Sequence, residues 1–94
     1  MWLYILTLLG KRPMYGYELK NEIKKHFGWA PATVTSYVVL YKLEAEDYVR
    51  TETKDVDNNG KNTRKYYIIT DKGKDLLAEG RGFLREILDK LESA

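Results

Sequence analysis

The stretch ATVTSYVVLYKLEAEDYVRTETKDVDNNGKNTRKYYIIT, residues 32–70, changes its periodicity partway along, and this change indicates the fold class. Residues 32–47 carry apolar side chains at helical spacing, which predicts a helix. Residues 48–56 are rich in β-branched side chains that partly alternate with charged ones, which predicts a strand. Residues 57–60 (DNNG) favour a tight turn because Asn and Gly tolerate positive φ. Residues 61–69 are then the returning strand.

Helices are expected on both sides of this stretch. Residues 1–9 are mostly apolar and are followed by Gly10 and Pro13, which predicts a short first helix. In residues 15–27 apolar side chains recur at every fourth position, which predicts a second helix that ends at Gly28. The order helix, helix, helix, strand, strand, helix is that of a winged helix-turn-helix, an α+β fold that is mainly α.

The last helix begins after Thr70, which is a suitable capping residue. Gly80 and Gly82 lie inside this helix, where each costs about 1 kcal/mol relative to Ala. We therefore expect the helix to bend there or another backbone to approach it closely.

Large apolar side chains form a stripe along this last helix that is wider than a small three-helix core requires. Leu76, Leu77 and Leu84 could close this chain's own core, and a partner chain would cover the rest. The expected dimerisation residues are Trp2, Phe83, Leu84, Ile87, Leu88 and Leu91. We expect a winged-helix DNA-binding domain over residues 1–70 and a dimerisation helix over residues 71–94, within one compact unit.

Composition excludes several classes of chemistry. The 94 residues contain no cysteine and a single histidine, His26, so disulfides, zinc ribbons and thiol nucleophiles are excluded, and we expect no metal and no cofactor. Glu44, Glu46 and Asp47 could serve a small hydrolase, but such a cluster at a helix end is usually a solvated face, so we expect no catalytic residues. The apolar run 2–9 is shorter than the about 20 residues that cross a bilayer. We expect no membrane partner and a cytoplasmic location.

The net charge of +2 is unevenly distributed. Residues 1–28 carry +3 and residues 57–70 carry +2, whereas residues 29–56 carry −2 and residues 71–94 carry −1. Two basic blocks favour a polyanionic partner if the fold brings them together. For a winged helix-turn-helix that partner is double-stranded DNA.

The helix over residues 32–47 suits entry into the major groove. Its first turn is hydroxylated and free of acids, so its backbone N–H groups can receive a phosphate oxygen and its hydroxyls can contact base edges. Val34 or Val38 could contact a thymine methyl group. Periodicity leaves its buried face open between two sets, Tyr37, Leu40 and Leu43 or Val34, Val38, Tyr41 and Ala45.

The hairpin supplies a second basic element, which could lie along a phosphate backbone or enter the minor groove. Exposed hairpins also carry Lys and Arg for solubility, and a protein-interaction module of the same fold is the alternative function. The candidate DNA-contacting residues are Tyr15, Thr33, Val34, Thr35, Val38, Lys42, Lys54, Asn59, Lys61, Asn62, Arg64 and Lys65.

Three motifs make the chain resemble the PadR family of transcriptional regulators. They are PMYGYEL at residues 13–19, YxxLxxLE at residues 37–44 and RKYYxxTxxG at residues 64–73. The resemblance implies a dimeric winged-helix repressor whose last helix packs against the other subunit, usually together with the first helix. A two-fold dimer implies a near-palindromic operator with half-sites about 10 bp apart or a multiple of that.

The resemblance also bears on the third helix and on a possible effector. It implies that Tyr37, Leu40 and Leu43 are internal, and family members usually have glycine at the position of Asp47. Asp tolerates left-handed φ better than most residues, so we expect the turn to survive.

Family members are often released from DNA by small aromatic or hydrophobic compounds, for which Trp2 and Phe83 are the candidate effector-binding residues. Aromatic side chains at helical spacing are more often part of the core. A chain with this short C-terminal helix would have little room for an effector pocket.

Overall fold

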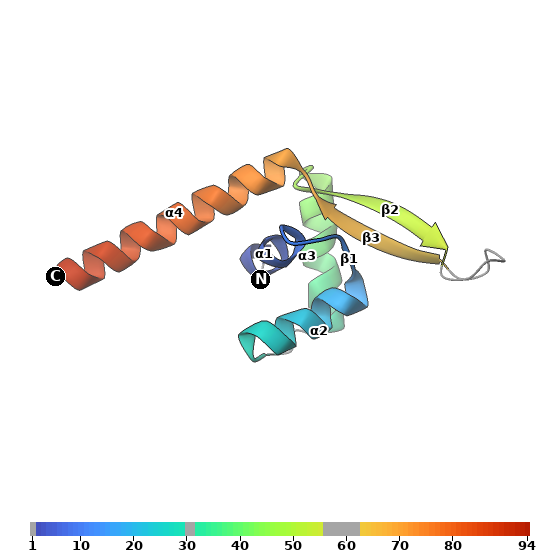
Figure 1. Cartoon of the computed structure of the whole chain (residues 1–94), viewed down its shortest axis with the longest axis horizontal. Helices are drawn as coiled ribbons and strands as arrows, with labels where there is room; N and C mark the ends of the chain where they lie inside the picture. Colours follow the sequence, from blue (N-terminus) through green and yellow to red (C-terminus); the bar gives the residue numbers. More distant parts are fainter. Residues whose placement is uncertain (1, 30–31, 56–62) are drawn as a thin grey trace.

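The computed structural model describes residues 2–29, 32–55 and 63–94. The helices within these segments are α1 (Trp2–Leu9), α2 (Gly16–Phe27), α3 (Thr33–Ala45) and α4 (Asp71–Ser93), and the strands are β1 (Met14–Tyr15), β2 (Val49–Asp55) and β3 (Thr63–Ile69). Helices α1 to α3 form the body, the hairpin of β2 and β3 projects from one side, and α4 projects from the other (Figure 1). The molecule is therefore elongated, with extents of 61 × 27 × 21 Å. The predicted winged helix-turn-helix, an α+β fold that is mainly α, is confirmed.

One strand was not expected from the sequence. We predicted that the second helix would include Tyr15, but Met14 and Tyr15 pair antiparallel with Tyr67 and Tyr66 of β3, and α2 begins at Gly16. The sheet order is β1-β3-β2, so β3 is the central strand. A strand of two residues is too short to show an alternating pattern, which is why periodicity misses it.

The core lies between α1, the inner faces of α2 and α3, and the sheet. α1 is apolar on most sides because other elements surround it, and Ile5, Leu6, Leu8 and Leu9 are all buried. The buried apolar side chains from the other elements are Met14, Leu19, Ile23, Leu40, Leu43, Val49, Tyr67 and Leu77. Within the described segments no helix is both long and apolar enough to cross a bilayer.

The structure selects one of the two candidate faces of α3. Leu40 and Leu43 are buried, whereas Val34, Val38 and Tyr41 are exposed. The family resemblance had placed Tyr37 with the internal residues. Its ring is half exposed but covers Gly16 so closely that a Cβ atom there would lie 2.6 Å from the Tyr37 hydroxyl oxygen.

Helix α4 is continuous through Gly80 and Gly82, so the bend that was one of the two expectations is not present. What approaches Gly80 is not another backbone but the side chain of Trp2, whose Cη2 would lie 2.9 Å from an added Cβ. Leu77 is buried in the core and Leu76 packs against it, but Leu84 is 50% exposed and does not close this chain's core. Residues 81–94 are all exposed, so the described part of the chain supports only about the first ten residues of α4.

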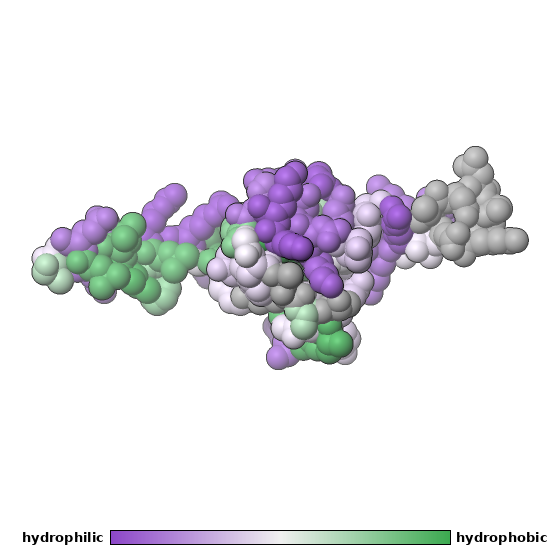
Figure 2. Space-filling view, turned by 90° about the horizontal axis from the view of Figure 1, so that it is seen from below, coloured by the Kyte–Doolittle hydropathy of each residue, from purple (hydrophilic) through white to green (hydrophobic). Residues whose placement is uncertain are grey.

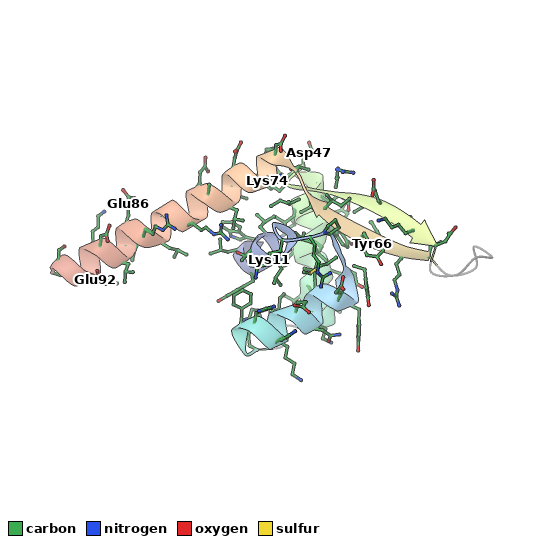
Figure 3. The ribbon with its side chains drawn as sticks, in the orientation of Figure 1. Lys11, Asp47, Tyr66, Lys74, Glu86 and Glu92 are labelled. Carbon is green, nitrogen blue, oxygen red and sulfur yellow. The ribbon has the colours of Figure 1, made fainter. Side chains whose placement is uncertain are left out.

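The end of α3 and the start of α4 are joined by a compact set of hydrogen bonds. Asp47 adopts the expected left-handed conformation, with φ of 63°, and turns the chain from α3 into β2. The Thr70 hydroxyl donates to the Asp47 carbonyl and accepts from the Gly73 N–H at 3.1 Å, so it caps α4 and holds the turn together. The Thr70 N–H donates to the Tyr48 carbonyl at 3.1 Å. Figure 3 shows Asp47 beside the beginning of α4.

The packing at this junction leaves no room for a side chain at Gly73, where a Cβ atom would overlap the Tyr48 carbonyl oxygen. Gly73→Ala is therefore expected to lower the free energy of unfolding by about 1–3 kcal/mol, the usual cost of overpacking. Gly82→Ala is the matched control, since nothing lies within 4 Å of a Cβ there. It should raise the free energy of unfolding by about 1 kcal/mol through helix propensity. Urea denaturation followed by circular dichroism measures both, and equal stability of Gly73→Ala and wild type would contradict the close contact.

Candidate nucleic-acid interface

The outer face of α3 is an exposed helical surface of the body. Helical geometry places Val34, Val38 and Tyr41 in one row along it, with Thr35 and Lys42 at one edge. All of these side chains are exposed. The structure therefore brings four of the candidate contact residues together on one surface: Val34, Thr35, Val38 and Lys42. A helix that enters the major groove needs such a surface.

The acids of α3 lie away from its first turns. No acidic residue occurs in the first turn, and the first acid along the helix is Glu44. Glu44 is engaged with the sheet, since its carboxylate lies 3.5 Å from the Lys65 ammonium group and accepts from the Thr51 hydroxyl at 3.5 Å. The surface near the start of α3 thus carries no carboxylate of its own helix.

The strand register divides the cations of the hairpin between its two faces. Arg64 pairs with Lys54 across the strands, and Lys65 pairs with Thr53. Because side chains alternate along a strand, Arg64 and Lys54 share one face with Tyr66, while Lys65 shares the other with Tyr67. The hairpin therefore does not present these three cations as a single cluster.

Tyrosine rings lie beneath Arg64 and Lys54 on the face that they share, which we call the outer sheet face. The Arg64 guanidinium lies over the Tyr15 ring at 4.4 Å from its centroid, and the Lys54 ammonium group lies over the Tyr66 ring at 5.3 Å. The two rings meet edge to face, with centroids 5.6 Å apart. Such cation–π contacts offset the repulsion of like charges on directly paired residues. Figure 3 shows Tyr66 on the sheet from which these side chains project.

This arrangement could be anticipated only in part from the sequence. Arg64 and Tyr66 are two residues apart in a predicted strand, which puts them on one face. Tyr15 joins them only through β1, whose existence periodicity does not reveal. Sequence reasoning therefore proposed Tyr15 and Arg64 as contact residues without placing them together, and it missed Tyr66.

The inner sheet face is more nearly neutral. Lys65 interacts with Glu44 and also lies 5.6 Å from the centroid of the Tyr67 ring. Burial raises the pKa of the Tyr67 hydroxyl above its ordinary value, with Lys65 opposing this and Glu44 and Tyr37 adding to it. Tyr67 is thus a neutral hydroxyl at physiological pH. Among the candidate cations that the structure describes, Lys65 is the one with a carboxylate beside it.

A hollow of about 230 Å³ joins the start of α2 to the hairpin. Tyr15, Tyr37, Arg64 and Lys65 are among its lining residues. It brings side chains from β1, α3 and β3 to one place, so the body and the hairpin form a continuous surface on this side.

Several predicted contact residues lie outside the described part of the structure. Asn59, Lys61 and Asn62 fall within residues 56–62, and the side chain of Thr33 is likewise not described. Their roles remain predictions.

The second half of α4 carries a separate apolar surface. Phe83, Leu84, Ile87, Leu88 and Leu91 are all exposed and follow one another along one side of the helix. Figure 2 shows apolar side chains gathered over this end of α4, with a second, smaller apolar area at the lower edge of the central body. The stripe continues the side of α4 on which Leu77 enters the core and Gly80 lies against Trp2 of α1.

An open apolar cavity of about 440 Å³ lies between α1, α3 and the start of α4. Trp2, Val39, Leu43, Tyr48 and Leu76 line it, with Lys42 and Glu46 as its charged members. Trp2 is thus at a cavity, as proposed for an effector residue, whereas Phe83 does not line it. Lys42 contributes to this cavity and also to the exposed face of α3.

Comparison with known proteins gives consistent results. The model of the Transcriptional regulator PadR-like family matches residues 5–79. A transcriptional regulator from Thermoplasma acidophilum is 35% identical, with a TM-score of 0.73 over 98% of this chain and 88% of that one. A PadR family transcription regulator from Clostridium difficile is 25% identical, with a TM-score of 0.87 over 98% and 94%. No match is found among curated proteins.

One similar structure contains DNA. Bacillus subtilis PadR in complex with operator DNA is 30% identical to this chain, with a TM-score of 0.75. The match covers 83% of this chain but only 44% of that protein. The similarity therefore extends over most of this chain but over less than half of the Bacillus subtilis protein.

Proposed function

Because the chain belongs to the PadR-like family, whose members are transcriptional regulators and not enzymes, we propose that it binds a specific DNA sequence and represses transcription there. It binds as a homodimer to a near-palindromic operator, with α3 in the major groove and the hairpin on the backbone or in the minor groove. As a regulator of chromosomal DNA it acts in the cytoplasm.

The outer surface of α3 is the observation that carries this proposal. Its first turns bear no carboxylate, and the nearest acid, Glu44, is engaged with Lys65. Arg64 and Lys54 project from the neighbouring hairpin and, among the described residues, neither forms an ion pair with a carboxylate. An acid-free helix face flanked by cations is complementary to a phosphate-lined groove. The operator complex of the similar Bacillus subtilis PadR supports the same ligand.

The exposed stripe of α4 supports the homodimer. Residues 81–94 are exposed throughout, and five of them are large apolar side chains on one side of the helix. Exposed apolar area of this extent, continuous with the packed side of the helix, is typical of an interface. A second copy would cover it with the same stripe about a two-fold axis.

The cavity beside Trp2 supports a small aromatic or hydrophobic effector. Its lining is apolar except for Lys42 and Glu46, and its volume of about 440 Å³ suits a small organic molecule. Phe83 would join such a site only through a partner subunit.

A protein-interaction module is the second candidate function. It is favoured by the exposed apolar side chains of α3, which could equally contact another protein, and by the small net charge of +2. The two functions differ in salt dependence, because phosphate contacts release counterions and apolar contacts do not.

Selection from random duplex DNA at about 150 mM salt, the physiological range in which specific DNA affinities are compared, tests the primary proposal directly. Enrichment of a near-palindrome, with two chains per duplex in sedimentation, is the expected result. Weak binding without sequence preference would instead favour the protein-interaction module. Reporter transcription from the selected site, with and without the protein, distinguishes a repressor from an activator.

Arg64 and Lys54 are expected to contribute more to DNA affinity than Lys65. Arg64→Ala should weaken binding to specific and random duplexes alike. It should also reduce the slope of log K against log salt concentration by about one, the contribution of one phosphate contact. Lys65→Ala is the matched control, one residue away, and should change the slope less because Glu44 already compensates its charge. Fluorescence anisotropy between 50 and 200 mM salt measures this. Equal effects of the two substitutions would show that the ion pair with Glu44 does not persist on DNA.

Placing a charge in the stripe of α4 is expected to separate the subunits. Leu88→Glu should shift the protein to monomer in sedimentation and weaken binding to a two-half-site duplex far more than to a single half-site. Asp89→Asn, on the opposite side of the helix, should leave both properties unchanged. A Leu88→Glu protein that stayed dimeric would place the interface elsewhere.

A further inference from the structure

The exposed face of α3 is apolar along much of its length. Val34, Val38 and Tyr41 are 76%, 47% and 73% exposed, although the core of this chain is completed by Leu40 and Leu43 from the other side. Together with Tyr37 and Lys42 they line an open hollow of about 450 Å³. In Figure 2 the smaller apolar area at the lower edge of the body marks this side of the molecule.

The same helix is poor in side chains that read bases through paired hydrogen bonds. Bidentate contacts to guanine and adenine come from Arg, Lys, Asn and Gln. Of these residue types the segment Thr33–Ala45 contains only Lys42. Among the described side chains on its exposed side, the remaining polar groups are the hydroxyls of Thr35, Tyr37 and Tyr41. Hydrogen bonds from α3 can therefore specify few base pairs.

We propose that Val34, Val38 and Tyr41 recognise the C5-methyl groups of thymines in the major groove, and that these contacts set the sequence of each half-site. The inference rests on the proposed function and names what its reading helix recognises. Thymine is the base that presents a methyl group in the major groove, and aliphatic side chains are its usual partners.

The charges around the row favour DNA over an apolar protein surface as its occupant. Lys42 lies at the edge of the row, and the hollow beside the hairpin, with Arg64 in its lining, includes Tyr37 from the same helix. The acid nearest to the row along the helix, Glu44, is engaged with Lys65 and Thr51. An apolar strip bordered by cations fits methyl groups on a groove floor between two phosphate backbones.

The spacing of the two valines predicts the spacing of the thymines. Residues four apart on a helix have Cβ atoms about 5–6 Å apart. Successive bases on one strand rise by about 3.4 Å. Val34 and Val38 would thus contact methyl groups about two base steps apart, on either strand.

Deoxyuridine substitution tests this without altering the protein, because it removes the C5-methyl group and keeps the base pair. In the selected duplex each thymine is replaced in turn, and Kd is measured by anisotropy. One or two positions in each half-site are expected to lose affinity by about fourfold, the effect of burying one methylene-sized group. Val38→Ala should weaken binding to the thymine duplex and no longer distinguish uracil from thymine at one of these positions. Lys54→Ala is the control, which should lose affinity on both duplexes and keep their ratio.

The outcomes separate this inference from the proposed function. If the protein selects a sequence but no uracil substitution changes Kd by more than about twofold, methyl recognition is wrong and the DNA-binding function stands. The same conclusion follows if Val34→Ala and Val38→Ala both keep the full thymine–uracil ratio. If no sequence is selected at all, both proposals fail, and the apolar row becomes a candidate protein contact.

Discussion

The arrangement of this molecule depends on one small junction, where Thr70 connects the end of α3 to the beginning of α4. Its hydroxyl caps α4 through the Gly73 N–H and at the same time donates to the Asp47 carbonyl in the turn after α3. Lys72 adds a hydrogen bond of 2.8 Å to the Glu46 carbonyl at the C-terminal end of α3, where a cation is favourable. This junction sets the direction of α4 together with the packing of Leu77 and Gly80 against the body. In a dimer built on α4, that direction determines how far apart the two copies of α3 lie.

The division of α3 into two unlike faces follows from the packing of the body. Leu40 and Leu43 meet α1 and the sheet, and this leaves Val34, Val38 and Tyr41 in solvent. A helix that is apolar on both sides is usually buried on both sides. Here none of the described residues covers the second side, which is a reason to assign it to a ligand rather than to stability.

The alternation of side chains along the strands distributes the cations of the hairpin between its two faces. Lys65 faces α3 and is compensated by Glu44, whereas Arg64 and Lys54 rest on tyrosine rings on the other face. A tyrosine ring restrains a cation without cancelling its charge, so these two remain able to attract phosphate. The surroundings of each basic residue in this hairpin therefore differ, with a carboxylate of α3 beside Lys65 and tyrosine rings beneath Arg64 and Lys54.

The sequence predicted the helices, the two long strands, the cap at Thr70 and the left-handed turn at Asp47, because each depends on local periodicity or on the conformational preference of one residue. It did not predict β1, since two residues show no period. At Gly80 and Gly82 it predicted a bend or the close approach of another backbone, whereas the helix continues and the Trp2 ring lies against Gly80. Leu84 was assigned in part to the core, but the length over which α4 is supported depends on the body beneath it.

By itself, then, the sequence determined the fold class, the family and the identity of the basic and apolar elements. Each of these depends on the periodicity, turn residues or motifs of short segments. Only the tertiary structure decided how exposed Tyr37 is, which lysine is compensated and how Tyr15 comes to lie beneath Arg64. These features arise from contacts between segments that are distant in the chain, and such contacts leave no periodic trace in either segment alone.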